Sequence, residues 1–178
     1  MPGGHAQTIW PALWRRADRV TAPRYRRERW STPDDDFVDV DWLDAPAAAP
    51  LLVLFHGLEG TSGSHYALAL AEWAQQQGWG LAVPHFRGCS GEINRAPRAY
   101  HSGDFAEIDW ILARLRANHT GPMYAIGVSL GGNALLRWAQ EAGNQATRLV
   151  QALASISAPV DLMASGLAIG RGVSRQVY

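Results

Sequence analysis

A serine stands at the centre of a short glycine-rich turn, Gly127-Val128-Ser129-Leu130-Gly131. An apolar run leads into this turn and a helical pattern leaves it, which is typical of a strand–turn–helix nucleophile elbow. Gly127 and Gly131 stand where a Cβ atom would collide with the neighbouring strand or helix. Such a turn holds the serine hydroxyl at the carboxyl edge of a sheet, beside a helix N-terminus that favours negative charge. We therefore predict that Ser129 is a nucleophile.

The elements around this turn alternate between strands and helices, which predicts an α/β fold with a mostly parallel sheet. Continuous apolar runs are typical of strands buried on both faces, and they lie at 51–55, 79–84, 122–126 and 149–156. Helical patterns lie between them at 66–77, 105–115 and 130–142. Ser102 is a candidate N-cap for the second helix. Before these elements, runs at 25–30 and 37–43 predict a hairpin closed by an aspartate-rich turn.

Three unusual loops follow the predicted strands, at His56-Gly57-Leu58, at 85–92 and at Ser129. Ligands of such sheets bind at the carboxyl ends of the strands, so the three loops should converge. A serine that is acylated by an ester needs donors for the developing oxyanion. One donor in this architecture is the backbone N–H after the nucleophile, and the other comes from the loop after the third strand. We assign these donors to the N–H groups of Leu130 and Leu58.

Five motifs in the same order resemble the YheT-type branch of the α/β-hydrolases, a family of predicted esterases related to the eukaryotic abhydrolase-domain lipases. They are G-G-H-A-Q-T at 3–8, H-G-L-E-G at 56–60, F-R-G-C-S-G-E-x-N-R at 86–95, Y-H-S-G-D at 100–104 and G-V-S-L-G-G-N at 127–133. The resemblance runs from Gly3 to about Tyr178. It implies hydrolysis of carboxylic esters through an acyl-enzyme on Ser129, with a small, even lipid-derived, ester as substrate. It assigns no role to Gly3-Gly4-His5 or to Tyr100-His101.

The chain departs from this fold after the nucleophile. The triad should continue with an acid and then a histidine, yet all six His residues precede Ser129, at 5, 56, 65, 85, 101 and 119. The acids that follow Ser129 are Glu141 and Asp161. We count six predicted strands, whereas the family resembled has about eight, with the acid and the His after the last two. Residues 1–178 therefore read as a single, incomplete domain, with an amino-terminal arm at 1–30 and the start of a cap at 160–178.

Several local alternatives stay open. His56, His85 or His101 would supply a base if one of them lay beside Ser129. Cys89 is a second candidate nucleophile, although a packed thiol is the simpler interpretation. We also expect Arg87 and Glu92 to form an ion pair that braces their loop. His65 and His119 flank helices and are expected at the surface.

Composition narrows the classes of function. The formal net charge is +0, which argues against nucleic acid as a partner. Seven Arg residues between positions 15 and 29 leave open a weak contact with an anionic membrane surface. No apolar run reaches the ~18 residues of a membrane span, no signal peptide is convincing, and the single Cys89 favours a reducing compartment, so we expect a cytoplasmic protein. No motif for a metal or cofactor is present.

Two other functions use the same residues or the same fold. An acyltransferase would pass the acyl group from Ser129 to an acceptor other than water. A catalytically dead α/β module would bind a ligand or a partner without reacting. Sequence does not separate these readings from ester hydrolysis.

Overall fold

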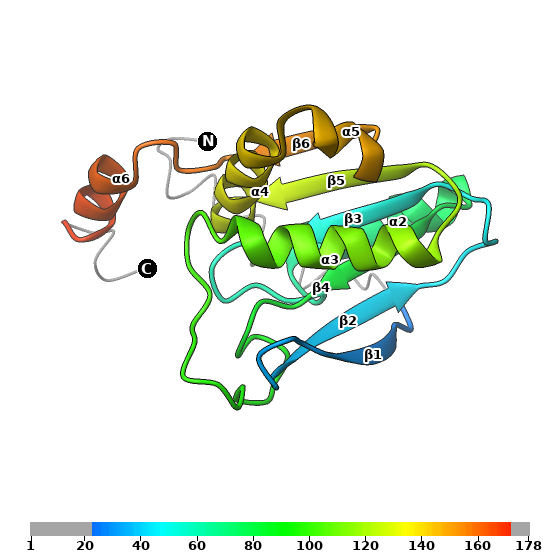
Figure 1. Ribbon diagram of the computed structural model, residues 1–178, viewed down its shortest axis with the longest axis horizontal. Coiled ribbons are helices and arrows are strands. Elements are labelled where there is room, and N and C mark those ends of the chain that lie inside the picture. The colour runs from blue at the N-terminus through cyan, green and yellow to red at the C-terminus, as the bar shows by residue number, and fades with distance from the viewer. Residues whose placement is uncertain (1–22, 172–178) are drawn as a thin grey trace.

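The computed structural model describes residues 23–171, which form a six-stranded sheet flanked by helices (Figure 1). The strands are β1 (Arg26–Ser31), β2 (Phe37–Leu43), β3 (Leu51–Phe55), β4 (Gly80–Pro84), β5 (Met123–Val128) and β6 (Ala152–Ile156). The helices are α2 (His65–Gln77), α3 (Phe105–Asn118), α4 (Leu130–Ala142), α5 (Ala146–Leu149) and α6 (Leu162–Ile169), with a 3-10 turn η1 (Gly143–Gln145) before α5.

The strand order is β1-β2-β4-β3-β5-β6. The hairpin β1–β2 is antiparallel and joins the sheet through an antiparallel pairing of β2 with β4. The pairs β4–β3, β3–β5 and β5–β6 are parallel. This arrangement confirms the α/β fold and the hairpin, and it brings the carboxyl ends of β4, β3, β5 and β6 to one edge of the sheet.

Apolar side chains of the central strands pack against helices on both faces of the sheet. Leu51, Val53 and Phe55 of β3 belong to the core beneath α3 and α4. Leu52 and Leu54 belong to the smaller core beneath α2. Figure 1 shows α3 and α4 in front of the sheet and α2 behind it. Because successive strand residues point to opposite faces, a continuous apolar run is what a strand covered on both sides requires.

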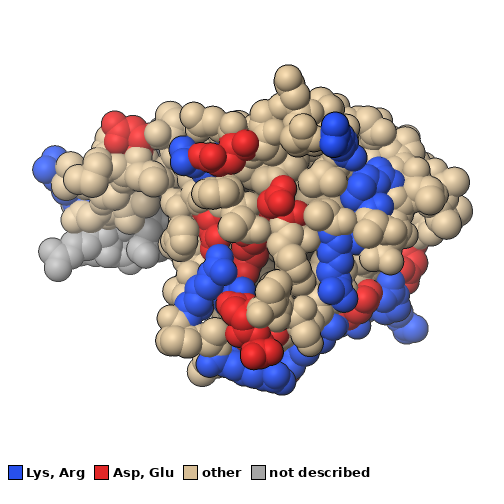
Figure 2. Space-filling model, viewed as in Figure 1, with Lys and Arg blue, Asp and Glu red and all other residues tan. Residues whose placement is uncertain are grey.

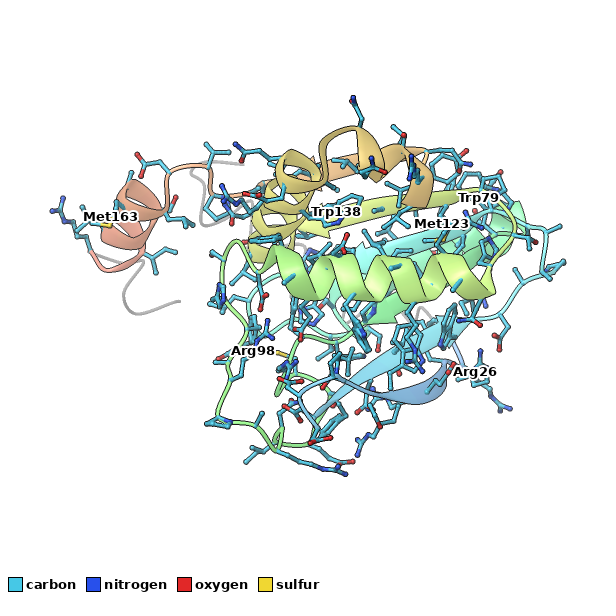
Figure 3. The ribbon with its side chains drawn as sticks, viewed as in Figure 1. Arg26, Trp79, Arg98, Met123, Trp138 and Met163 are labelled. Atoms are coloured by element: carbon cyan, nitrogen blue, oxygen red, sulfur yellow. The ribbon has the colours of Figure 1, made fainter. Side chains whose placement is uncertain are left out.

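Side chains from the helices complete the larger core. Trp138 is 1% exposed, lies between α4 and the sheet in Figure 3, and donates its indole N–H to Asp109 Oδ1 of α3 at 2.8 Å. Full burial of one large apolar side chain contributes about 1.5–3 kcal/mol. The indole bond leaves no polar atom of Trp138 unsatisfied and fixes α4, which carries the elbow, against α3.

Two predicted boundaries are wrong. The last apolar run does not begin a strand at Leu149, because residues Ala146–Leu149 form α5 and the strand starts at Ala152. β6 pairs only with β5 in the described part of the chain, so its side chains are alternately exposed and half-buried rather than buried on both faces. Ser102 does not cap α3 either. The cap position belongs to Asp104, whose carboxylate accepts from Arg98 at 2.8 Å.

The helix α6 stands away from the sheet (Figure 1) and none of its residues is buried. Met163, labelled in Figure 3, is 77% exposed. No helix within residues 23–171 is long and apolar enough to cross a membrane. The expectations for Gly3-Gly4-His5 and for most of the arginine-rich arm fall outside the described residues.

Candidate active site

Ser129 lies between the end of β5 and the first residue of α4, and its backbone is strained. Its φ of 52° and ψ of −116° lie in a region that residues other than glycine rarely occupy. Hydrogen bonds on both sides hold this conformation. The Ser129 N–H donates to Ile156 O at 2.9 Å, and the Ser129 carbonyl accepts from Asn133 N–H at 3.0 Å. The strain and its supports match the sharp strand-to-helix turn that the sequence predicts.

The glycines around Ser129 allow three backbone segments to meet. A Cβ atom on Gly127 would lie 2.5 Å from Gly131 O, and one on Gly131 would lie 2.4 Å from His56 O. A Cβ atom on Gly57 would lie 3.3 Å from the Cβ of Ser129. The loop after β3 therefore lies directly beside the serine. This confirms the predicted reason for Gly127 and Gly131.

The loop after β3, residues 56–60, begins beside the turn that carries Ser129. We call it the oxyanion loop, after the role that the sequence predicts for its Leu58 amide. Phe55 pairs with Gly127 in adjacent parallel strands, so the residues that follow them leave the sheet side by side. The amide of Leu130 lies in the first turn of α4, where helix N–H groups have no intrahelical acceptor. Two free amides beside a serine can stabilise an anion that forms on a substrate carbonyl.

His56 is a structural residue and does not act as the base. It is 0% exposed. Its Nε2 accepts the Phe86 N–H at 3.0 Å, so the ring proton lies on Nδ1, which donates to Gly57 O at 2.8 Å. Both nitrogens are therefore occupied within the loop, and burial lowers the pKa of His56 to about 4. Neutral His56 joins the loops that follow β3 and β4.

This buried imidazole predicts a pH dependence of stability. An unfolded His has a pKa near 6.5, so between about pH 6.5 and 4 the unfolded chain binds a proton that folded His56 does not. The free energy of unfolding should fall by roughly 3 kcal/mol as the pH drops through this window. Urea denaturation of the full-length protein at a series of pH values measures it.

The comparison variant is His56→Gln, in which the free energy of unfolding should depend much less on pH. A smaller slope of the same sign should remain, because burial also lowers the pKa of His119. Asp36 acts in a lower window. Burial alone would raise its pKa, but bonds from the Arg95 amide and the Asn94 side chain lower it to about 2. A wild-type slope that matches the variant's would contradict the assignment to His56.

The other candidate bases are also engaged elsewhere. His85 is buried, with Nε2 2.8 Å from Asp41 Oδ2 and Nδ1 3.3 Å from Cys89 O. His101 is exposed, and its Nδ1 lies 2.9 Å from Ser102 O. None of these contacts is to Ser129. The structure therefore gives no support to His56, His85 or His101 as a substitute base.

The predicted ion pair between Arg87 and Glu92 is not formed. The Arg87 side chain is 3% exposed and turns inward, where Nε donates to Glu107 Oε1 at 2.7 Å and Nη1 to Asp36 Oδ2 at 2.8 Å and Asp34 Oδ2 at 2.9 Å. Glu92 instead accepts from Arg29 at 2.9 Å. The reason is geometric, because carboxylates from α3 and from the turn between β1 and β2 already surround the Arg87 guanidinium.

These ion pairs bind the loop after β4 to its neighbours. Arg87 ties it to α3 and to the turn between β1 and β2, while Arg29 ties it to the hairpin itself. Figure 2 shows acidic and basic side chains interleaved in the lower part of this face, over the hairpin and that loop. Asp35 in the turn between β1 and β2 has a φ of 58°, a left-handed conformation that aspartate tolerates.

Cys89 lies half-buried in the same loop, and burial raises the pKa of its thiol. A thiol is a nucleophile as its thiolate, so this environment opposes reactivity. The packed-thiol interpretation is therefore favoured over the nucleophile.

The fold and the elbow together define the class. The family model for the alpha/beta hydrolase fold matches residues 50–173, and the chain belongs to that family. Within it, the chain is 45% identical over 175 residues to the YheT protein of Escherichia coli (strain K12), which carries the name of an esterase. The match covers 96% of this chain and 50% of that protein. The resemblance to the YheT-type branch is thus confirmed.

More distant relatives agree. The chain is 26% identical over 170 residues to the mouse protein named phospholipase ABHD3, a match that covers 84% of this chain and 41% of the relative. The solved Pyrococcus furiosus esterase Pf2001 superposes with a TM-score of 0.67 at 17% identity, covering 84% of this chain and 57% of that one. That likeness shows the fold alone. The chain spans about half the length of the curated relatives it matches.

Sequence reasoning missed two residues that contact the oxyanion loop. The hydroxyl of Tyr66 accepts from Gly57 N–H at 3.0 Å, and that of Tyr100 accepts from Glu59 N–H at 2.9 Å. Tyr66 opens the helical pattern at 66–77 and lies nine positions after Gly57, which is the one available signal of a contact. Tyr100 belongs to the motif Y-H-S-G-D but lies 41 positions from Glu59, so nothing local indicates its contact.

Proposed function

We propose that Ser129 is the nucleophile of a hydrolase of carboxylic esters. The observation that carries this proposal is the strained Ser129 backbone, held between β5 and the N-terminus of α4 with Gly57 packed against it. In the first step the Ser129 Oγ attacks the ester carbonyl, and the developing oxyanion accepts from the Leu58 and Leu130 N–H groups. Collapse of the tetrahedral intermediate expels the alcohol and leaves an acyl-enzyme, which water then hydrolyses.

This chemistry needs a base that takes the Ser129 proton and returns it to the leaving alcohol. His56 and His85 are committed to structural bonds, so neither is a candidate for this base. We propose that the triad acid and histidine follow Tyr178 in a longer protein, and that residues 1–178 alone are inactive. The half-length match to relatives supports this proposal.

We propose further that 1–178 is one hydrolase domain and that residues from 160 onward begin its cap. Exposed apolar side chains of α6, among them Met163 and Leu167, support the second part, since a cap presents apolar surface to an acyl chain. The relatives named as an esterase and as a phospholipase favour a carboxylic ester as substrate, including a lipid-derived one. The proposal assigns no metal and no cofactor, and it places the protein in the cytoplasm.

A fluorophosphonate probe tests the nucleophile directly in the full-length protein. We expect covalent labelling at Ser129, together with turnover of short-chain p-nitrophenyl esters. Ser129→Ala should abolish both. The matched control is Ser157→Ala, because Ser157 also has a left-handed backbone, with a φ of 51°, but leads into no helix N-terminus. An unlabelled wild-type protein would favour the catalytically dead binding module, and retained activity in Ser129→Ala would refute the nucleophile.

A further inference from the structure

Three backbone amides of the oxyanion loop have acceptors among the described residues. Gly57 N–H donates to Tyr66, Glu59 N–H donates to Tyr100, and Gly60 N–H donates to Gly57 O at 2.9 Å. Gly57 O also accepts from His56 Nδ1. Within residues 23–171 the amide of Leu58 donates to no acceptor. The free donor is therefore bracketed by two amides that tyrosine hydroxyls occupy.

Core packing does not fix the exposed part of this loop, at Leu58 and Glu59, although its other residues are buried. The Leu58 side chain is 66% exposed, so it contributes little to holding its own amide. Glu59 has a φ of 51°, a conformation that persists in a non-glycine residue only where its surroundings impose it. Hydrogen bonds must therefore set the orientation of the peptide groups on either side of Leu58.

Both tyrosines are themselves held firmly. A Cβ atom on Gly60 would lie 2.5 Å from the Tyr66 hydroxyl, so the loop closes tightly around that oxygen. The Tyr100 ring stacks on Phe86 with centroids 5.3 Å apart and an interplanar angle of 8°. Phe86 in turn meets the His56 ring edge-on at 4.9 Å. The two supports reach the loop from different elements, α2 and the loop after β4.

The hydroxyl of Tyr100 has the protonation state that this contact requires. Burial raises its pKa to about 12, so it stays protonated at neutral pH. The neighbouring Cys89 side chain also raises the pKa of this hydroxyl. A protonated hydroxyl keeps lone pairs that can accept the Glu59 N–H.

We propose that Tyr66 and Tyr100 are positioning residues for the oxyanion hole, and this proposal rests on the function proposed above. By accepting the Gly57 and Glu59 amides, the two hydroxyls leave the Leu58 N–H as the free donor between them. They also fix the peptide planes that aim it beside Ser129. Without these hydroxyls, the Gly57 and Glu59 amides lose their acceptors. The peptide groups on either side of Leu58 then take several orientations, and the Leu58 N–H is no longer preorganised.

The catalytic test uses Tyr66→Phe, Tyr100→Phe and the double variant in the full-length protein. A matched control is Tyr124→Phe, because Tyr124 lies on β5 and stacks on Trp79 at 5.3 Å, away from the loop. We expect kcat for p-nitrophenyl acetate to fall about tenfold in each single variant, with KM changed less than about twofold, since the hole acts on the transition state. Affinity for a trifluoromethyl ketone, which forms an oxyanion adduct on the serine, should fall by the same factor.

A decrease in kcat with unchanged affinity for the trifluoromethyl ketone would contradict the proposal, and so would an effect confined to KM or to thermal stability. A second measurement does not depend on turnover. Amide hydrogen exchange at Gly57 and Glu59 should be slow in the wild-type protein and at least about tenfold faster in the corresponding Phe variant, whereas Leu58 exchanges fast in all. Fast exchange of the Gly57 and Glu59 amides in the wild-type protein would refute the positioning role of the tyrosines, even if the probe labels Ser129. Slow exchange in a protein whose Ser129 resists labelling would support the hydrogen bonds of the tyrosines and would contradict the proposed esterase function instead.

Discussion

Gly131→Ala should prevent stable folding of the full-length protein. The added Cβ would lie 2.4 Å from the carbonyl oxygens of Phe55 and His56, and both contacts are with backbone that cannot move without shifting β3. Alanine is about 1 kcal/mol better than glycine in a helix interior, but the overlap outweighs this gain. We expect a net loss of more than about 3 kcal/mol in the free energy of unfolding.

The control for this prediction is Gly166→Ala in α6, where an added Cβ meets nothing within 4 Å. There the helix propensity should act alone and leave stability unchanged or raise it by up to about 1 kcal/mol. Denaturant titration of both variants makes the comparison. A Gly131→Ala protein as stable as the Gly166→Ala protein would mean that α4 does not approach β3 as described.

Arg87→Met should destabilise the protein by about 3–5 kcal/mol at pH 7, because it leaves buried carboxylates without a counter-charge. Asp36 is 1% and Glu107 4% exposed, and both accept from Arg87. Glu107 Oε2 has no partner among the described residues, so the guanidinium is its main compensation. Methionine retains most of the apolar bulk, which isolates the effect of charge.

The sign of the pH dependence distinguishes this mechanism from simple loss of packing. Burial already raises the pKa of Glu107, and removing Arg87 raises it further. A carboxyl whose folded pKa is raised supports the folded state at low pH and opposes it at high pH. The deficit of Arg87→Met should therefore shrink between pH 7 and pH 5, and Glu107→Leu should partly rescue it. Arg148→Met, at an exposed site on α5, should change stability by less than about 0.5 kcal/mol. A deficit that stays constant with pH would point to lost packing instead.

Sequence patterns predicted the parts of this fold that depend on interactions between residues close together in the chain. The apolar runs at β3, β4 and β5 located the buried strands because such strands need apolar residues on both faces. Gly127 and Gly131 located the elbow because only glycine fits there. The last strand was misplaced because Leu149 continues the same apolar run but forms the end of a helical turn. Apolar character alone does not separate those two states.

The candidate site was predicted less completely. Ser129, Leu58 and Leu130 follow from local motifs, and their roles stay proposals. The partners of Arg87 could not be predicted, since they come from positions 34, 36 and 107, which only the folded chain brings together. The contact of Tyr100 with Glu59 spans 41 positions for the same reason. Long-range polar pairing leaves no periodic trace in a single sequence.

Arginine–aspartate pairs join the two strands of the hairpin. Arg27 and Arg29 lie directly across β1–β2 from Asp41 and Asp39, and each guanidinium meets its carboxylate with two hydrogen bonds of 2.7 and 2.8 Å. All 16 basic residues of the chain are arginine. A lysine loses its charge near pH 10.4, whereas a guanidinium keeps it beyond pH 12. The pairs that join β1 to β2, and the pair that joins Arg29 to Glu92 in the loop after β4, therefore persist in strongly alkaline solution, where the corresponding lysine pairs would lose their positive charge.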